Sequence, residues 1–432
     1  MSDYQLLVIG AGPGGYTAAL RAAKLGLHTA IVERREVGGT CLNRGCIPTK
    51  TLLHASQVYH DAANGASVGV HGALSYDMGE MFAFKRSVSE KLRGGILSLL
   101  KSAKVDVLEG TAQITAPGQV SVTGADGTRT AYTAERILAA TGSVNVRPPI
   151  PGLDLPGVMT SDELLEGTDT PYASIIIIGG GVIGVEFATF YSHLGCRVTL
   201  VEGMANLLPQ LDRELGQNLA QILKKQGVEV LTSAMVRSLE QTGEGLCVHL
   251  EQKGKELTVT GEKVLCAIGR RAYFDGLFAP DLNPALNGKR LLVDEDYRTS
   301  IPGVYAIGDA SAAVQLAHVA AAQGTDCVER MCGGKGSTDL NVIPSCIYSA
   351  PEIAVVGLTE AEAKEQGIPA VSGKCTLFSN ARTIIEDPGR CFMKLVARSD
   401  TREIIGAQLM CQHASDMISQ LSTAMVNHLT AR

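Results

Sequence analysis

The chain has 432 residues, enough for two to four domains. It has 38 Lys and Arg against 44 Asp and Glu, a formal charge of −6, so it lacks the basic excess that binding to nucleic acid or to an anionic membrane surface requires. With 45% hydrophobic residues, 48 glycines and no tryptophan, the composition favours an α/β protein with well-buried cores and many tight turns.

The N-terminus leads from Met1 directly into a predicted strand at 5–9, with no signal peptide ahead of it. No apolar run reaches the roughly 18 residues that a membrane span needs. Eleven cysteines without a secretory signal predict a reducing compartment, in which a disulfide would be catalytic and not structural. We therefore expect a cytoplasmic protein with no nucleic-acid or membrane partner, whose ligands are small molecules or proteins.

A glycine turn follows the first strand. The run Gly-Ala-Gly-Pro-Gly-Gly at 10–15 precedes a predicted helix at 16–25. In such a unit one glycine permits the turn, one lets backbone approach a pyrophosphate at the helix N-terminus, and one lets helix and strand pack closely. The next predicted strand, 28–32, ends at Glu33, 23 residues after Gly10, where a carboxylate can accept from ribose hydroxyls. This pattern predicts a dinucleotide site.

Two cysteines lie in the run Gly-Gly-Thr-Cys-Leu-Asn-Arg-Gly-Cys-Ile-Pro-Thr-Lys at 38–50. Bridged cysteines have Cα atoms about 4.4–6.8 Å apart, whereas five residues of regular helix rise about 7.5 Å. A bridge between Cys41 and Cys46 therefore requires irregular backbone, which the flanking glycines allow. Pro48 favours a helix that starts near Cys46, where a thiolate would be stabilised by the helix N-terminus.

Two other interpretations of these cysteines are open. Both could be ordinary buried thiols. Cys327 and Cys332 have the same spacing, but Cys327 lies in a predicted helix at 315–331 and Cys332 directly follows it, so we interpret that second pair as structural. Zinc is disfavoured because structural sites space their cysteines more closely and need a second ligand pair. No metal site is predicted.

The strand, glycine turn and helix recur further along the chain. After predicted helices from 50 and at 87–100, a strand at 105–109, alternation at 119–132 and a buried strand at 137–142, a β-branched strand occupies 174–178. It leads into Gly-Gly-Gly-Val-Ile-Gly at 179–184, a helix at 185–194 and a strand at 197–201 that ends at Glu202, again 23 residues after the first glycine. The repeat predicts two Rossmann-like units that hold two dinucleotides.

The acid of the second unit indicates which nicotinamide cofactor is used. Glu202 is followed by Gly203 and Met204, and the nearest downstream arginine is Arg213. A 2′-phosphate would require a basic group there, so NAD is favoured over NADP.

The remaining pattern consists of shorter elements. A strand at 265–271 ends in glycine and arginine, and a strand at 304–307 ends in Gly308 and Asp309 ahead of the helix that opens at 315. From 339 onward, short strands and helices alternate at 342–345, 351–357, 359–366, 391–397 and 404–409, followed by a last helix that starts near His413 and includes His428.

The 38–50 motif resembles the active-site signature of the flavin-dependent pyridine nucleotide–disulfide oxidoreductases, the family that includes dihydrolipoamide dehydrogenase, glutathione reductase and mercuric reductase. The resemblance extends over essentially the whole chain. It implies an α/β fold with two Rossmann-like dinucleotide-binding domains plus an α+β interface (dimerisation) domain. The implied division is 1–145 and 273–338 for FAD, 146–272 for NAD, and 339–432 for the interface.

The resemblance also implies site residues. Catalytic roles fall to Cys41, Cys46, Lys50 and Glu186. Residues that match flavin contacts are Gly10, Gly12, Gly14, Gly15, Glu33, Arg34, Gly39, Thr40, Lys50, Gly110, Ala112, Thr141, Gly142, Gly308, Asp309, Ala317 and His318. Residues that match NAD contacts are Gly179, Gly181, Val182, Ile183, Gly184, Glu202, Val236, Ala267, Gly269 and Arg270.

The reaction implied is oxidation of dihydrolipoamide by NAD⁺ through a Cys41–Cys46 disulfide, because Leu-Ala-His at 316–318 is most similar to the dihydrolipoamide-oxidising members. The implied partners are a second copy of the chain and the lipoyl domains or acyltransferase core of a 2-oxoacid dehydrogenase complex or glycine cleavage system. The family's C-terminal His-Pro segment and following glutamate do not match, since the sequence stops at Arg432, and neither His413 nor His428 takes the base role. Alternatives are another NAD(P)H-dependent disulfide or mercuric reductase, or an inactive flavoprotein subunit.

Overall fold

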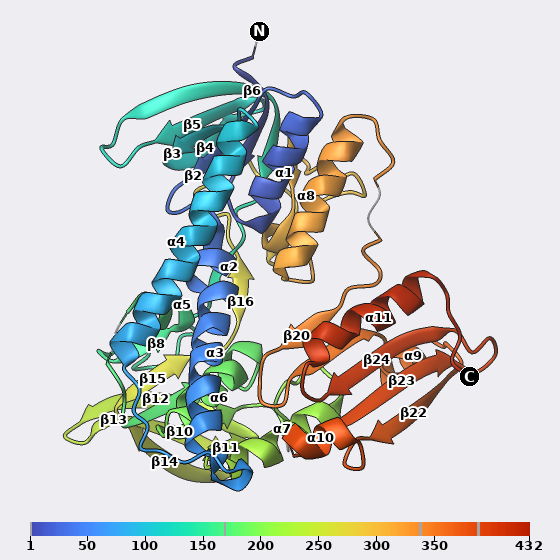
Figure 1. The fold of residues 1–432 in the computed structure, drawn as a ribbon. Coiled ribbons are helices and arrows are strands. Elements are labelled where there is room, and N and C mark those ends of the chain that lie inside the picture. Colours follow the sequence, from blue (N-terminus) through green and yellow to red (C-terminus); the bar gives the residue numbers. More distant parts are fainter. Residues whose placement is uncertain (1, 168–169, 337–338, 387–388) are drawn as a thin grey trace. The chain divides into compact units, whose positions relative to one another are not determined.

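The structure is a computed structural model that describes residues 2–167, 170–336, 339–386 and 389–432 (Figure 1). The chain divides into two compact units. Unit 1 comprises Met1–Pro48, Ala83–Asn145 and Arg270–Leu340; unit 2 comprises Thr49–Phe82, Val146–Gly269 and Asn341–Arg432. Within the described residues, no helix combines the length and the apolar character that a membrane crossing requires.

Unit 1 is built on a sheet of seven strands, β3-β2-β1-β6-β5-β4, in which β19 also pairs with β6. Its strands are β1 (Tyr4–Ile9), β2 (Thr29–Glu33), β3 (Asp106–Glu109), β4 (Thr111–Ala116), β5 (Gln119–Thr123), β6 (Arg129–Ala139) and β19 (Val304–Ala306). β6 has two roles: its first half continues an antiparallel meander with β5, and its second half lies parallel to β1 and β19. The predicted alternation at 119–132 is therefore a hairpin that continues into the buried strand.

The helices of unit 1 cover this sheet. They are α1 (Pro13–Lys24), α2 (Gly39–Arg44) and α8 (Ala317–Met331), together with the 3₁₀ turn η2 (Gly308–Ala310). Unit 1 also contains two small antiparallel strand pairs: β7 (Ser143–Asn145) pairs with β16 (Arg270–Ala272), and β17 (Leu286–Asn287) pairs with β18 (Arg290–Leu291). α1 and α8 lie side by side (Figure 1), and a Cβ at Gly324 would come 2.5 Å from the carbonyl oxygen of Gly14. Only glycine at that crossing permits so close an approach.

Two helices, α3 (Cys46–Ala63) and α4 (Met78–Ser102), have residues in both units. The prediction for α4 was too short, because the helix begins nine residues before Ser87. Asp77 Oδ1 accepts a hydrogen bond from the N–H of Glu80, 3.0 Å away, as a capping side chain does at a helix start.

Unit 2 contains a parallel sheet, β11-β10-β9-β15-β8, an antiparallel sheet, β12-β13-β14, and a C-terminal sheet, β20-β21-β24-β23-β22. Its strands are β8 (Val158–Thr160), β9 (Ser174–Ile178), β10 (Arg197–Glu202), β11 (Glu229–Thr232), β12 (Ala234–Thr242), β13 (Gly245–Gln252), β14 (Lys255–Gly261), β15 (Lys263–Cys266), β20 (Ser345–Ile347), β21 (Ile353–Gly357), β22 (Ala370–Thr376), β23 (Phe392–Arg398) and β24 (Ile404–Met410). Its helices are the 3₁₀ turn η1 (Gly65–Val68), α5 (Ser161–Glu166), α6 (Val182–His193), α7 (Arg213–Lys225), α9 (Glu360–Glu365), α10 (Ala381–Glu386) and α11 (Ala414–Val426).

Several predicted boundaries in unit 2 need correction. α6 begins at Val182 and not at 185, and residues 342–344 are not in a strand. The sequence pattern missed α5, α7, α10, β8, β11, β12, β13, β14 and β22. His428 lies beyond the end of α11, not in the helix, with a positive φ of 52°. In unit 1, α8 begins two residues after the predicted start at 315.

The central strands are apolar throughout because both of their faces are buried. Leu7 and Ile9 of β1 belong to one core cluster, and Leu6 and Val8 belong to another. The same alternation divides Ile175 and Ile177 of β9 from Ile176 and Ile178. Side chains on a strand alternate between its faces, so a continuous apolar run is what a parallel strand covered on both sides requires.

Ion pairs join α7 to the C-terminal sheet within unit 2. Lys394 Nζ lies 2.7 Å from Asp212 Oδ2, and the two side chains are only 16% and 15% exposed. Lys374 pairs with Glu214, in the first turn of α7. Apolar residues of this sheet also belong to the same core cluster as β9 and α6.

His193, the last residue of α6, is 4% exposed and stacks on His60 with ring centroids 4.3 Å apart. Neither of its ring nitrogens has a hydrogen-bond partner among the described residues. Burial, followed by the neighbouring His60 ring, lowers the pKa of His193 from 6.5 to about 3. The folded protein therefore holds this imidazole neutral while the unfolded chain binds a proton between those two pH values.

We predict that this histidine makes stability pH-dependent. Because the pKa of His193 is lower in the folded state, the folded protein is most stable relative to the unfolded chain above about pH 6.5 and loses stability as pH falls towards 3. Between pH 6.5 and 5 the free energy of unfolding should fall by about 2 kcal/mol. His193→Phe should keep the ring stack and flatten the pH dependence of the thermal midpoint over this interval. His54→Gln, on an exposed residue of α3, is the control; an equal slope in wild type and His193→Phe would contradict the assignment.

Candidate active site

The backbone of the cysteine motif is irregular, as the spacing predicted. Gly38 and Gly39 have positive φ values of 101° and 59°, and α2 begins at Gly39. The helix ends at Arg44, its C-cap residue Gly45 has φ −147° and ψ −115°, and α3 begins at Cys46. Cys41 is half-buried in α2, whereas Cys46 is exposed at the first position of α3. The predicted helix start at Cys46 is confirmed, and the bridge between the two sulfurs stays a prediction.

The motif lies against the glycine loop that precedes α1. The N–H of Gly38 donates to the carbonyl oxygen of Ala11 over 2.8 Å, and a Cβ on Gly39 would come within 2.6 Å of the Cα of Gly12. Burial, followed by the Cys41 thiol, raises the pKa of Tyr16 on α1. The structure therefore brings the cysteine motif and the first predicted dinucleotide loop together within unit 1.

Three residues that sequence reasoning missed hold this loop in place. Asn43 donates from Nδ2 to the carbonyl oxygens of Val37 (3.1 Å) and Gly39 (3.0 Å). Arg44 is buried and pairs with Glu36. Ser89 of α4 donates to the carbonyl oxygen of Leu42 over 3.0 Å. The adjacent Asn43 and Arg44 between the two cysteines could have predicted this role, because buried polar side chains need hydrogen-bond partners.

The two glycine loops have equivalent hydrogen bonds, one in each unit. Gly10 N–H donates to Val32, and Gly179 N–H donates to Val201, each over 2.8 Å. Gly10 and Gly179 have φ values of 101° and 113°, where a side chain would be strained. A Cβ on Gly15 or on Gly184 would lie 1.8 Å from the carbonyl oxygen of the turn glycine before it. These contacts are the close strand–helix packing that the sequence repeat predicted.

The two acids also have equivalent contacts. Glu33 accepts from the N–H of Ala11 (2.8 Å) and of Arg35 (2.9 Å). Glu202 accepts from the N–H of Gly180 (2.6 Å) and of Met204 (2.6 Å). Each carboxylate therefore lies at its glycine loop, at the end of the second strand of its unit. Contact with a ribose stays a prediction.

Both helix N-termini suit the phosphates of a dinucleotide. The N-cap residues of α1 and α6 are Gly12 and Gly181, and neither supplies a side-chain acceptor for the first-turn N–H groups. A Cβ on Gly12 would meet only the Cα of Gly39 within 4 Å, and a Cβ on Gly181 would meet no described atom within that distance. N–H groups without a side-chain cap, beside a space that no side chain fills, fit an anionic ligand.

Lys50 and Glu186 form an ion pair inside unit 2. Lys50 Nζ donates to both carboxylate oxygens, over 2.7 and 2.8 Å. The side chain of Glu186 is 4% exposed and that of Lys50 is 30% exposed. The N–H of Tyr348 donates to Glu186 Oε1 over 3.0 Å, and Lys50 Nζ lies 4.8 Å from the centre of the Tyr348 ring. The structure thus brings together Lys50 and Glu186, to which the resemblance assigns catalytic roles, and adds Tyr348, which was not predicted.

A polar network surrounds the predicted Gly308-Asp309 turn in unit 1. Asp309 Oδ2 accepts from the Ser143 hydroxyl over 2.6 Å, and Ser143 Oγ accepts from Arg270 Nε over 2.9 Å. The N–H of Gly308 donates to Gln323 Oε1 over 2.8 Å. Ser143 and Gln323 were not predicted. The guanidinium of Arg270, predicted for the NAD site, also donates to Asn145 Oδ1 over 2.8 Å, so it is engaged by β7.

The other predicted flavin residues are placed as follows. Arg34 stacks on the Tyr273 ring at 4.2 Å, and Tyr273 accepts at its carbonyl oxygen from the Thr141 hydroxyl and donates its N–H to Gly142. The N–H of Gly110 donates to the carbonyl oxygen of Glu33 over 2.9 Å. Thr40 lies in α2, Ala112 is buried in β4, Gly14 lies against α8, and Ala317 and exposed His318 begin α8.

The other predicted NAD residues all lie in unit 2. Val182 and Ile183 form the first turn of α6, and Ala267 follows β15, where its N–H donates to Ile178. Gly269 has a φ of 112°. The side chain of Val236 is 7% exposed and belongs to the core of unit 2, so only its main chain is left for a ligand contact.

We predict that the Lys50–Glu186 pair contributes to stability. Lys50→Met should lower the free energy of unfolding by on the order of 1–3 kcal/mol, because it leaves a buried carboxylate without its cation. The loss should be smaller than for a fully buried ion pair, because the Lys50 side chain is 30% exposed. Glu186→Gln should cost less, and the double variant should show coupling in denaturant unfolding. Arg271→Met, from an exposed ion pair with Asp275, is the control and should change stability by at most about 0.5 kcal/mol. Additive effects of the two substitutions would rule the coupling out.

Comparison with known proteins identifies the family. Residues 4–324 match the family "Pyridine nucleotide-disulphide oxidoreductase", and residues 343–432 match its dimerisation domain. A dihydrolipoyl dehydrogenase of Bacillus subtilis is 37% identical over 440 residues, which cover 98% of this chain and 92% of that protein.

Two solved structures are also similar. LpdA from Mycobacterium tuberculosis superposes with a TM-score of 0.90 at 27% identity, covering 99% of this chain and 94% of that one. The HOCl-induced flavoprotein disulfide reductase RclA from Escherichia coli superposes with a TM-score of 0.87 at 28% identity, with the same coverage. The predicted α/β fold with dinucleotide-binding and dimerisation domains is confirmed. The chain belongs to the pyridine nucleotide-disulphide oxidoreductase family, whose members bind FAD and NAD(P)H, and it is a flavoprotein disulfide oxidoreductase.

Proposed function

We propose that the protein oxidises dihydrolipoamide to lipoamide with NAD⁺, using Cys41 and Cys46 as a redox-active pair. One observation supports the choice above others: the cysteine motif lies in a chain that is similar, over nearly its whole length, to a protein named dihydrolipoyl dehydrogenase. The proposal makes Cys41, Cys46, Lys50 and Glu186 the residues of the reaction centre.

The thiol chemistry follows from the two sulfurs. A thiolate of the substrate attacks Cys41 Sγ, which forms a mixed disulfide and breaks the Cys41–Cys46 bond, so that Cys46 leaves as a thiolate. The second substrate thiol then attacks its own mixed-disulfide sulfur and displaces Cys41. The substrate closes to its cyclic disulfide and loses two electrons and two protons, and the protein's cysteine pair holds the electron pair.

The position of Cys46 favours its role as the leaving group. It is the first residue of α3, an 18-residue helix whose N-terminal N–H groups favour a negative charge. Lys50 follows one turn later on the same helix, so the two side chains share a face. Glu186 holds Lys50 by two hydrogen bonds, which restrict where its ammonium group lies.

The first glycine loop, with Glu33 and the Gly308–Asp309 turn, would hold FAD, and the second loop with Glu202 would hold NAD. When bound, FAD would supply an acceptor for the electron pair of the cysteines, and NAD⁺ would supply the final hydride acceptor. The residues of the chain bind and orient these groups. Glu202 favours NAD over NADP, because its carboxylate would repel a 2′-phosphate and the adjoining Gly203 and Met204 offer no cation.

The proposed assembly is a homodimer that serves the lipoyl domains or acyltransferase core of a 2-oxoacid dehydrogenase complex, or a glycine cleavage system. The match of 343–432 to a dimerisation domain supports the homodimer. The division into 1–145, 146–272, 273–338 and 339–432 is likewise a proposal.

A second candidate is a different disulfide reductase. The similarity to RclA, a flavoprotein disulfide reductase induced by HOCl, favours it. Activity assays separate the two: the proposed enzyme should use dihydrolipoamide and NAD⁺ far better than glutathione and NADP⁺. Reduction of another disulfide without lipoamide turnover would select the second candidate, and flavin binding without either activity would indicate an inactive subunit.

We predict that Cys41→Ser abolishes dihydrolipoamide oxidation while the bound flavin stays at the wild-type ratio, because the nucleophilic attack needs sulfur at 41. Cys332→Ser is the matched control, since Cys332 is an exposed cysteine at the end of α8. Its turnover should equal that of the wild type. Turnover that persists in Cys41→Ser would remove the redox pair from the proposal.

We predict opposite losses from the two equivalent acids. Glu33→Ala should lower the flavin content of the purified protein, whereas Glu202→Ala should raise the KM for NAD⁺ by about 10-fold or more and leave flavin content unchanged. Flavin absorbance per chain and steady-state kinetics measure the two effects. Loss of flavin from Glu202→Ala with Glu33→Ala unaffected would reverse the two sites.

A further inference from the structure

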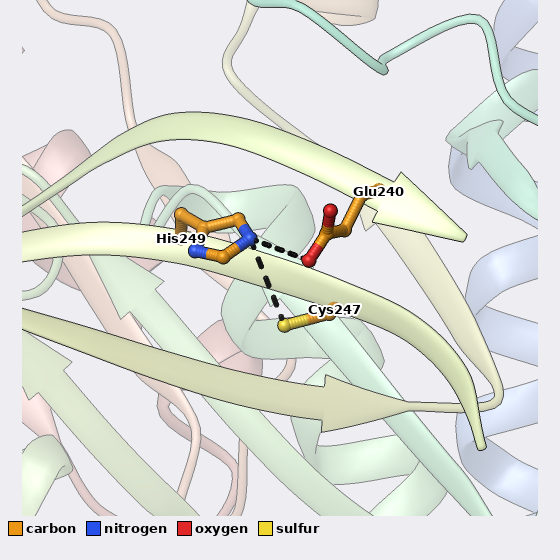
Figure 2. A group of neighbouring side chains, drawn as sticks. All are labelled: Glu240, Cys247 and His249. Carbon is orange, nitrogen blue, oxygen red and sulfur yellow. Dashed lines mark hydrogen bonds and ion pairs between the residues drawn. The ribbon is translucent and has the colours of Figure 1, made fainter. Parts of the chain in front are cut away.

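Three side chains with metal-binding atoms converge on the antiparallel sheet of unit 2 (Figure 2). Glu240 is on β12, and Cys247 and His249 are on β13, two residues apart and therefore on the same face of the strand. Glu240 is the direct cross-strand partner of Cys247. The register of the β12–β13 hairpin, which the sequence analysis did not predict, brings these three side chains together.

The ligand atoms are close. His249 Nε2 lies 3.0 Å from Glu240 Oε1 and 4.0 Å from Cys247 Sγ. All three ligand atoms lie within 4.8 Å of one another. Figure 2 shows both interactions starting from the same ring nitrogen of His249.

This convergence argues against a catalytic triad. In a Cys-His-acid triad one ring nitrogen faces the nucleophile and the other faces the acid, so that the ring relays a proton between them. Here a single nitrogen faces both the sulfur and the carboxylate. A bound cation requires ligand atoms that surround one point, and the nitrogen, oxygen and sulfur here lie within 4.8 Å of one another.

We propose that Glu240, Cys247 and His249 form a zinc-binding site. Zinc takes sulfur at about 2.3 Å, imidazole nitrogen at about 2.0–2.1 Å and carboxylate oxygen at about 2.0–2.2 Å. Tetrahedral angles then place the ligand atoms about 3.4–3.6 Å apart. The sulfur–nitrogen separation must shorten by about 0.4 Å and the nitrogen–oxygen separation must lengthen by the same amount. Rotation of the Glu240 side chain, which is 60% exposed, can lengthen the nitrogen–oxygen separation, and rotation of the His249 ring, which is 40% exposed, can shorten the sulfur–nitrogen separation.

The surroundings leave one position to solvent. The side chains of Leu246, Val248 and Leu250 belong to the core on the opposite face of β13. Glu251 is paired with Arg237 over 2.6 Å and is engaged there. The His249 side chain is 40% exposed, so water completes a site of three protein ligands and one open position. Zinc would join β12 to β13 next to their connecting turn.

Zinc binding to the flavin-loaded protein tests the proposal. Cys41 and Cys46 are changed to Ser throughout, so that the proposed redox pair cannot compete for metal, and Zn²⁺ is titrated against a chromophoric chelator. We expect one tight site per chain. Cys247→Ser, His249→Gln and Glu240→Gln should each weaken zinc binding by at least about 10-fold, whereas Cys375→Ser and Glu251→Gln should leave it unchanged. Cys375 is an exposed cysteine elsewhere in unit 2.

X-ray absorption at the zinc edge gives a readout of the ligands themselves. We expect one sulfur at about 2.3 Å with nitrogen and oxygen at about 2.0 Å, and loss of the sulfur in Cys247→Ser. Glu240 is exposed, so Glu240→Gln keeps the test valid if either β13 variant fails to fold. No equimolar zinc binding, or equal binding in all three ligand variants, would overturn the proposal.

Discussion

The contact between Gly12 and Gly39 is the constraint on which the rest of unit 1 depends. A side chain on Gly39 would collide with the backbone of the first glycine loop, so the cysteine motif can reach the N-terminus of α1 only without one. The hydrogen bond from Gly38 to Ala11 then fixes the approach. Main-chain contacts alone thereby join two segments, the N-terminus of α1 and the cysteine motif. Their relative position tolerates little change, because a shift of either segment would break the Gly38–Ala11 hydrogen bond and the Gly12–Gly39 contact.

The two nucleotide units show what a repeated sequence does and does not specify. The turn glycine, the packing glycine and the acid have equivalent contacts in both units. What differs is the neighbour: the first loop meets the cysteine motif, whereas Gly180 of the second loop lies against Leu207 and Glu202. The same local motif can thus serve one ligand beside a redox pair and another ligand without one.

Much of the fold was predictable because its signals are local. Glycine runs, β-branched strands and acids at fixed spacing determined both nucleotide units, and Cys46 at a helix start followed from Pro48. Two of the missed elements lack such signals: β22 is exposed along nearly its whole length, and α10 has no buried residue. In contrast, α7 was missed although its sequence carries both an N-cap, Asp212, and an amphipathic pattern with one buried face. Tyr348 and Ser143 depend on contacts with Glu186 and Asp309, which lie 162 and 166 residues away, and spacing in one sequence cannot reveal such contacts. The Glu240 cluster depends on the register of the β12–β13 hairpin, which the sequence analysis did not predict. The start of α4 was a different failure, since Asp77 and Glu80 carried a capping signal that apolar periodicity overlooked.

The ion pairs between α7 and the C-terminal sheet bear on how separable that sheet is. Although residues 343–432 match a domain of their own, Lys394 is largely buried against Asp212, and Phe392 and Met410 share a core with Phe187 and Leu215. Excised alone, the segment would expose that apolar face and lose the Lys394–Asp212 ion pair. We therefore expect residues 343–432 not to fold as an independent domain. A chimaera that exchanges the C-terminal segment between relatives must exchange α7 with it, or match its charges.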